Sequence, residues 1–205
     1  VNSALAGPAI RRQTDAAMIA PVPAHATPEL TVVVPTFNER ANIRPLVARL
    51  AAALEGIRWE AVFVDDDSPD GTAREVRAVA REDGRIRVLH RIGRRGLSGA
   101  CIEGILSSVA PICAVIDADL QHDETILPRM YAALHETPAL DLVIGTRNAA
   151  GGSSDQGLSQ GRQIGSDLAT RLARRVLKIE ASDPMSGFFM VRRTAFNEVV
   201  VDLQS

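Results

Sequence analysis

The residues most suited to chemistry are Asp117 and Asp119, which stand one small residue apart at the end of the apolar run Ile112–Ile116. Because only Ala118 separates them, both carboxylates can turn toward the same side of the chain. Two carboxylate oxygens suit a hard divalent ion such as Mg²⁺ or Mn²⁺, which retains open positions for the phosphate oxygens of a substrate. Gln121 continues the alternation and can add a neutral oxygen.

Other polar groups also follow short apolar runs. They are Pro35, Asn38 and Glu39; Asp65, Asp66 and Asp67; and Thr146 with Arg147. In parallel sheets, ligands gather outside the carboxyl ends of the strands, so we expect these groups to line one site. Arg147, Arg192 and Arg193 each follow an apolar run and are candidate partners for an anionic ligand.

The elements that must position these groups alternate regularly. Predicted strands lie at Leu30–Pro35, Ala61–Val64, Ile86–His90, Ile112–Ile116 and Leu140–Gly145. Helical patterns lie between them, through Leu46, Leu50 and Leu54, up to about Asp83, over Gly96–Val109 and over Leu127–Leu134. Almost entirely apolar strands that alternate with helices predict an α/β fold, with a parallel sheet covered by helices on both faces.

Composition excludes several functions. The net charge of the 205-residue chain is −2 and only 3% of its residues are aromatic, which argues against a nucleic-acid-binding protein. No uninterrupted apolar run reaches the ~18 residues of a membrane span. Cys101 and Cys113 lie in apolar surroundings without metal-ligand spacing, so we expect buried free thiols. Residues 1–28 are predicted to be a flexible leader, and residues 29–205 one domain.

Two further segments allow more than one interpretation. The glycines of Gly93–Gly99 follow a strand and open a helix, but their GxxGxxG spacing does not match the dinucleotide-binding GxGxxG, so an oxidoreductase is disfavoured. The stretch Arg162–Lys178 is a basic amphipathic helix. Its cationic face is either simply solvated or in contact with anionic lipid head groups, at roughly 1 kcal/mol per basic residue.

Five motifs, in order, resemble a known family. They are VVPTFNE at 33–39, VDDDSPDGT at 64–72, DADLQH at 117–122, IGTR at 144–147 and SDPMSGFF at 182–189. Together they resemble the inverting GT-A glycosyltransferases of family 2, and most closely the dolichol-phosphate (polyprenol-phosphate) mannosyltransferases. The resemblance implies a GT-A (Rossmann-like) three-layer sandwich with a mostly parallel sheet.

The resemblance also implies roles for individual residues. The nucleotide-sugar would be held by Pro35, Phe37, Glu39, Val64, Asp66, Asp117, Ala118, Asp119 and Arg193. The divalent ion, Mg²⁺ or Mn²⁺, would be bound by Asp117, Asp119 and Gln121, and the lipid phosphate by Arg147, Arg162 and Ser166. Asp119 and Arg147 would be catalytic.

The implied reaction is inverting transfer of mannose from GDP-mannose to a polyprenyl or dolichyl phosphate, giving a β-mannosyl phosphoryl polyprenol and GDP. A phosphomonoester is already an anionic nucleophile at neutral pH, since its second pKa is about 6, so no general base is required. His122 is the nearest candidate if one is used. Two alternatives stay open: a UDP-glucose:polyprenyl-phosphate glucosyltransferase or related transferase, and a non-catalytic nucleotide-sugar-binding subunit.

Two departures from the family pattern concern the acceptor side. Asp123 stands where a Pro usually follows the His of the metal motif, and Leu158 stands where a Trp is frequent. Relatives generally continue beyond the last residues of this chain, often into membrane helices. We therefore expect a domain truncated at its C-terminus, with a C-terminal membrane segment as one candidate for the missing part. The protein would act at the cytoplasmic face of a membrane, in peripheral contact with it.

Overall fold

The computed structural model describes residues 27–145 and 187–203. Within them, six strands form one sheet in the order β3-β2-β1-β4-β6-β5. The strands are β1 (Leu30–Thr36), β2 (Trp59–Asp65), β3 (Ile86–His90), β4 (Ile112–Val115), β5 (Leu142–Ile144) and β6 (Phe189–Arg192). The first four pair in parallel, whereas β6 runs antiparallel to both β4 and β5.

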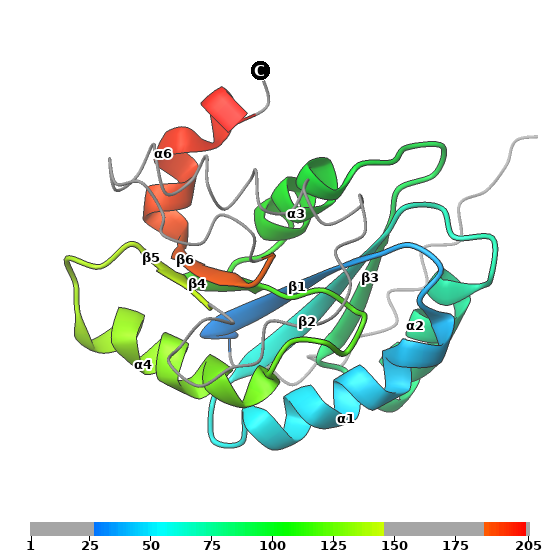
Figure 1. The fold of residues 1–205 in the computed structure, drawn as a ribbon, viewed down its shortest axis with the longest axis horizontal. Helices are drawn as coiled ribbons and strands as arrows, with labels where there is room; N and C mark the ends of the chain where they lie inside the picture. The colour runs from blue at the N-terminus through cyan, green and yellow to red at the C-terminus, as the bar shows by residue number, and fades with distance from the viewer. Residues whose placement is uncertain (1–26, 146–186, 204–205) are drawn as a thin grey trace, which may run out of the picture.

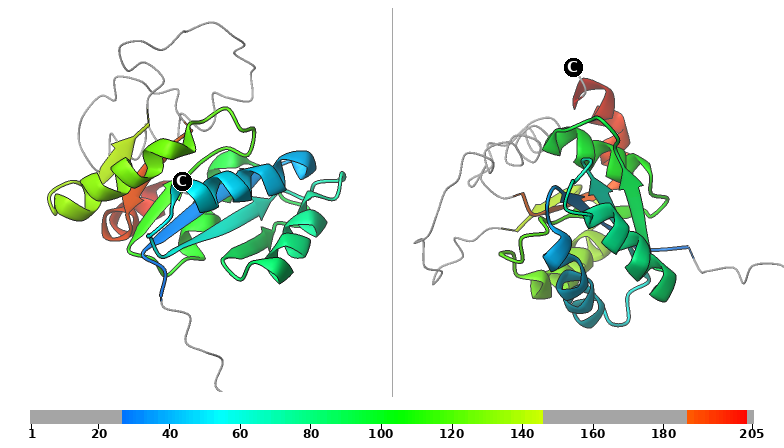
Figure 2. Two further views of the ribbon diagram at one scale, coloured as in Figure 1. Left: turned by 90° about the horizontal axis from the view of Figure 1, so that it is seen from below. Right: turned by 90° about the vertical axis from the view of Figure 1, so that its right-hand side faces the viewer.

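Helices cover both faces of this sheet (Figure 1). On one face lie α1 (Ile43–Ala53), α2 (Thr72–Glu82) and α4 (Leu127–Glu136), and on the other α3 (Leu97–Leu106) and α6 (Arg193–Leu203). The short 3₁₀ turns η1 (Arg40–Asn42) and η2 (Glu124–Ile126) precede α1 and α4. Seen from below, α1, α2 and α4 lie across the near face of the sheet (Figure 2). The predicted three-layer α/β arrangement with a mostly parallel sheet is therefore confirmed.

Successive residues of the strands pack into two separate hydrophobic cores, one on each face of the sheet. Val32, Val34 and Phe63 pack with the layer of α1, α2 and α4, whereas Val33 and Val62 pack with α3 and α6. This alternation follows from the two-residue period of a strand, which sends successive side chains to opposite faces. Both cysteines are buried and free, as predicted: Cys101 lies on α3 and Cys113 on β4. Each core is apolar, so both faces of the sheet stabilise the fold by burial.

The structure adds one strand that the sequence patterns did not predict. The patterns predict no strand at 187–191, yet residues 189–192 form β6 between β4 and β5. The predicted strand Leu140–Gly145 is shorter in the structure, Leu142–Ile144. Most of the predicted leader and the whole predicted basic helix, Arg162–Lys178, lie outside the described residues.

The carboxyl ends of β1, β2 and β4 share one edge of the sheet, called here the carboxyl edge. Three non-glycine residues with positive φ follow these strands: Asn38 (61°), Asp67 (58°) and Leu120 (61°). Left-handed backbone is uncommon outside glycine and concentrates where a site demands it. The carboxyl edge is therefore where the chain adopts its least common backbone conformations.

Candidate functional site

Asp117 and Asp119 lie directly beyond β4 at the carboxyl edge. The Asp117 side chain is about one-third exposed (32%), and its Oδ2 accepts a hydrogen bond from His122 Nε2 at 3.1 Å. His122 is itself buried and its ring packs against Phe188, with centroids 5.2 Å apart. Because His122 is held between Asp117 and Phe188, it is placed to orient that carboxylate rather than to act as a separate base.

Asp119 is shaped by a tight local turn. Its Oδ1 accepts from the backbone N–H of Gln121 at 3.0 Å, across Leu120 with its positive φ. Such side-chain-to-backbone turns are typical of Asp and fix the direction of the carboxylate. Gln121 is exposed. Both carboxylates of the motif are thus positioned by contacts within residues 117–122.

A third carboxyl group lies in the electrostatic field of this pair. Glu39 follows β1, is partly buried and accepts a 2.6 Å hydrogen bond from the Asn42 amide. Burial raises the pKa of Glu39, and the negative charges of Asp119 and Asp117 raise it further. The adjacent ends of β1 and β4 therefore concentrate negative charge.

These residues fit a divalent cation. Their donors are hard oxygens, and a cation would offset the repulsion from Asp119 and Asp117, which adds to the effect of burial on the Glu39 pKa. Gly187 also leaves room beside Asp117, since a Cβ there would lie 3.0 Å from its Oδ2. Among residues 27–145 and 187–203, no three His, Cys, Asp or Glu side chains converge to hold a metal unaided. An ion bound by Asp117 and Asp119 keeps positions for ligand oxygens.

A cavity of about 230 Å³ opens at the same edge, above β1 and β2. It is lined by Pro35, Thr36, Phe37, Asp66, Arg95, Gly96, Leu97 and Ala100. Its walls are partly apolar and partly polar, as in sites that enclose a small ligand. At its rim the Arg95 guanidinium lies over the Phe37 ring, with Cζ 4.4 Å from the ring centroid. Of the nucleotide residues expected from the resemblance, Pro35, Phe37 and Asp66 line this cavity together.

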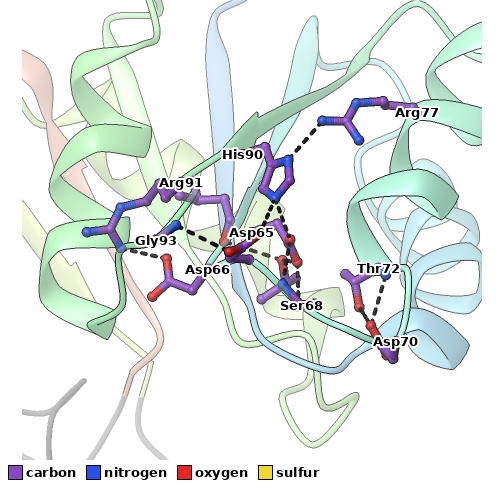
Figure 3. A network of polar contacts seen from close by, with 12 residues as sticks. Asp65, Asp66, Ser68, Asp70, Thr72, Arg77, His90, Arg91 and Gly93 are labelled. Atoms are coloured by element: carbon purple, nitrogen blue, oxygen red, sulfur yellow. Dashed lines mark hydrogen bonds and ion pairs between the residues drawn. The ribbon is translucent and has the colours of Figure 1, made fainter.

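Three consecutive aspartates end β2 and begin the turn that follows, and each has different partners; Figure 3 shows Asp65 and Asp66. Asp65 is fully buried and accepts from Ser68 Oγ at 2.6 Å and from the Ser68 N–H at 3.1 Å. Asp66 accepts from Arg91 Nη1 at 2.6 Å and from the Gly96 N–H at 2.7 Å. One aspartate therefore closes the turn after β2, and the next holds the loop that leads into α3.

Asp67 completes this network. It accepts from His90 Nε2 at 3.0 Å and from the Gly93 N–H at 3.2 Å, and these two bonds lower the pKa of Asp67, with His90 the main cause. Arg77 Nη2 lies 3.1 Å from His90 Nδ1. Since arginine can only donate, Nδ1 accepts and Nε2 carries the proton that it donates to Asp67. Asp66 and Asp67 thus fix loop 91–96, which forms one wall of the cavity.

Other residues expected to bind the donor are placed differently. Val64 is fully buried and Ala118 is 3% exposed, and both side chains lie in the apolar cores, so a nucleotide would contact these residues through their backbone. Arg193 lies away from the carboxyl edge. It begins α6 after the antiparallel strand β6 and so lies at the opposite edge, where it donates to the carbonyls of Ile105 and Ala110.

Arg147, Arg162 and Ser166, assigned to the lipid phosphate, lie outside the described residues. In contrast, two arginines of loop 91–96 were not singled out by the sequence. Arg91 is the buried partner of Asp66, and Arg95 lines the cavity. The sequence signal that could have found them is their position, because the loop leaves β3 at the carboxyl edge and leads into α3.

Comparison with known proteins decides the family. Residues 31–200 match the family described as Glycosyl transferase family 2. The chain belongs to glycosyltransferase family 2. This family 2 chain is 38% identical over 168 residues to a dolichol-phosphate mannosyltransferase of Saccharomyces cerevisiae, covering 80% of this chain and 61% of that protein. It is 34% identical to a protein of the same name from Pyrococcus furiosus, covering 80% of this chain and 46% of the relative.

The chain therefore spans about three fifths of the yeast protein and less than half of the archaeal one. A mannosyltransferase from Pyrobaculum calidifontis, solved in complex with GDP-Man and Mn²⁺, is similar in structure. Its TM-score is 0.60 at 21% identity, over 84% of this chain and 47% of that one. This likeness confirms the GT-A fold of the family 2 chain. In its described part, no helix is both long and apolar enough to cross a bilayer.

Proposed function

We propose that this family 2 chain transfers mannose from GDP-mannose to a polyprenyl or dolichyl phosphate. The observation that carries the proposal is the placement of Glu39, Asp117 and Asp119 at the ends of β1 and β4, beside the cavity above β1 and β2. A donor whose base lies over β1 and β2 would extend its diphosphate toward the end of β4. The names of the yeast and archaeal relatives support mannose and dolichyl phosphate as the sugar and the acceptor.

In the proposed reaction, an oxygen of the acceptor phosphate attacks C1 of mannose. The bond from C1 to the donor diphosphate breaks, its electron pair leaves with GDP, and the new C1–O–P linkage has the inverted configuration. The acceptor is already anionic at neutral pH, so no proton has to be removed. This agrees with the engagement of His122 by Asp117. The protein's work is alignment and stabilisation of the charge on the leaving group.

Asp117 and Asp119 are the residues that would hold a Mg²⁺ or Mn²⁺ ion, with Gln121 beside them. When bound, such an ion supplies positive charge at the departing diphosphate. The chain's own contribution is to orient Asp117 through His122, and Asp119 through the backbone of Gln121. Arg147, Arg162 and Ser166 remain the proposed contacts of the lipid phosphate, and contact with the cytoplasmic face of a membrane remains part of the proposal.

A transfer assay tests the proposal directly. GDP-mannose and UDP-glucose are each incubated with one short polyprenyl phosphate, with and without EDTA, and with Mn²⁺ added back. We expect mannosyl transfer that EDTA abolishes and Mn²⁺ restores, and at least 10-fold slower transfer from UDP-glucose. Faster transfer from UDP-glucose would favour the glucosyltransferase alternative. Donor binding without any transfer would favour a non-catalytic binding subunit.

A further inference from the structure

Loop 91–96 carries three arginines with three different environments. Arg91 is 5% exposed and pairs with Asp66 and Glu103. Arg94 is exposed and makes two hydrogen bonds to Glu103, at 2.8 and 2.9 Å. Among the residues that the structure describes, Arg95 forms no ion pair, and its guanidinium covers the Phe37 ring instead. Arg95 is therefore the arginine of this loop whose partner is an aromatic face.

The backbone beneath Arg95 is firmly held. The Gly96 N–H donates to Asp66 at 2.7 Å, the Gly93 N–H donates to Asp67 at 3.2 Å, and the Gly96 carbonyl accepts from Arg91 at 3.1 Å. The Arg91 side chain is enclosed in turn, because a Cβ on Gly99 would lie 2.7 Å from its Nη2. With the loop fixed at both ends, the Arg95 side chain can change rotamer at the cavity rim without moving the wall behind it.

The contact between Arg95 and Phe37 closes the space that a flat ring would use. Their separation is 4.4 Å, whereas a ring stacked between two planar groups needs about 7 Å between them, twice the optimal contact distance. Phe37 is 41% exposed, so its ring already presents an aromatic surface to the cavity. A planar guanidinium stacks readily on aromatic faces and carries its charge with little hydration. A base can therefore stack on the Phe37 ring when the Arg95 guanidinium moves away from that ring by the thickness of one flat ring.

We propose that Arg95 is a specificity-determining residue that stacks on the nucleobase of the donor, on the face opposite Phe37. The inference rests on the proposed function, because it concerns the same nucleotide. A purine offers a larger face to the guanidinium than a pyrimidine does, so the contact favours a guanine nucleotide over a uracil nucleotide. Asp66 also lines the cavity, but its carboxylate already accepts hydrogen bonds from Arg91 and Gly96. Stacking on Arg95 therefore adds selectivity between bases that Asp66 does not provide alone.

The test is calorimetric titration of GDP, UDP and pyrophosphate, each with Mn²⁺, into the wild-type chain and the variants Arg95→Ala, Arg95→Lys and Arg94→Ala. For Arg95→Ala we expect about 5- to 20-fold weaker GDP binding, a smaller loss for UDP and no change for pyrophosphate. Arg95→Lys keeps the charge but not the plane, so it should restore less than half of the lost GDP binding free energy. Arg94→Ala is the matched control and should bind all three ligands like wild type.

Each other outcome has a distinct meaning. If wild type binds GDP and Arg95→Ala binds it equally tightly, the stacking role is overturned and the proposed donor stands. If pyrophosphate binding falls along with GDP binding, Arg95 contacts the phosphates and the role on the base is overturned. If wild type binds neither GDP nor UDP, the proposed donor fails and this inference fails with it. Mannosyl transfer with saturating GDP-mannose should keep its wild-type kcat in Arg95→Ala, with the change confined to the donor KM.

Discussion

The two edges of the sheet treat charge in opposite ways. At the carboxyl edge, Glu39, Asp117 and Asp119 stand close enough for the two aspartates to raise the pKa of Glu39. The three non-glycine residues with positive φ follow strands at the same edge. Repulsion and uncommon backbone conformations both cost stability, and they persist only where the surrounding fold enforces them.

At the amino edge, charged side chains donate hydrogen bonds to backbone carbonyls. Arg192 donates to the carbonyls of Leu134, Thr137 and Leu140, just beyond and within the end of α4. Arg193 donates to the carbonyl of Ile105 at the end of α3 and to that of Ala110, between α3 and β4. Two consecutive arginines thus cap two helices on opposite faces of the sheet, where the helix dipole favours a cation. The amino edge satisfies its own polar groups, whereas the carboxyl edge gathers charge that a ligand can compensate.

The largest effect is expected from Asp66→Ala, which tests a carboxylate at the carboxyl edge that stabilises the fold by holding loop 91–96. Asp66 and Arg91 form a buried pair with side chains 9% and 6% exposed. Asp66→Ala leaves the buried Arg91 guanidinium with Glu103 and the Gly96 carbonyl as its remaining partners, and it leaves the Gly96 N–H without its acceptor. We therefore expect a loss of about 3 kcal/mol in the free energy of unfolding, measured by urea denaturation. The control Glu82→Ala breaks an exposed pair with Arg44 and should cost far less, because solvent screens an exposed ion pair. Equal costs for the two variants would contradict the loop-fixing role of Asp66.

Asp119→Ala should leave the fold intact and remove activity. We expect mannosyl transfer to fall by about 10²-fold or more, because a group positioned to stabilise charge at the reacting centre is lost. The unfolding midpoint should stay near that of wild type, since Asp119 is only partly buried. Asp141→Ala, the same charge change at the amino edge, is the control and should retain transfer. Near-normal turnover of Asp119→Ala in Mn²⁺ would remove Asp119 from the proposed mechanism.

The position of the acidic residues was predictable from sequence because it depends on local pattern. An apolar run that ends in carboxylates at Asp117 and Asp119 marks the carboxyl end of a strand, and parallel strands bring such ends together. Almost entirely apolar strands that alternate with helices likewise predicted the layers. The separate partners of Asp65, Asp66 and Asp67 were not predictable, because consecutive residues of a turn point in directions that depend on distant groups such as Arg91.

Arg193 shows how a local pattern can misplace a residue. The sequence placed it after an apolar run, as it did Asp117, and nothing local distinguishes a parallel strand from an antiparallel one. The pairing of Val115 with Phe189 reverses β6 and carries its end to the amino edge. Such pairing joins residues far apart in sequence and is decided by the assembled sheet. Val64 and Ala118 show a related limit, since a residue next to a site can direct its side chain into the core and leave only its backbone facing the site.

Arg193→Met tests the amino edge. The aliphatic stem is kept, but the carbonyls of Ile105 and Ala110 lose a charged donor, so we expect about 2 kcal/mol less stability in urea denaturation. GDP affinity in Mn²⁺ should be unchanged, which is opposite to the result expected of a diphosphate contact. The exposed Arg129→Met serves as control and should stay within about 0.5 kcal/mol of wild type. A selective loss of GDP binding in Arg193→Met would restore the assignment made from sequence.

The smallest effect is expected from Glu39→Gln, and it depends on pH. Because the pKa of Glu39 is raised in the folded protein, mainly by burial and further by Asp119 and Asp117, the folded state holds this proton more tightly than the unfolded state. The contribution of Glu39 to stability is therefore most favourable below the ordinary carboxyl pKa and declines as pH rises through the raised value.

Gln cannot ionise and still accepts from Asn42. Glu39→Gln should thus be more stable than wild type at pH 7 and lose that advantage below about pH 4, as measured by thermal unfolding across pH in EDTA. Mn²⁺ with GDP should narrow the difference at pH 7, because a bound cation compensates the same repulsion. If the stability difference between Glu39→Gln and wild type stays constant from pH 4 to pH 7, ionisation of Glu39 beside the aspartates does not cause it. The contrast between the two edges would then rest on Asp117 and Asp119 alone.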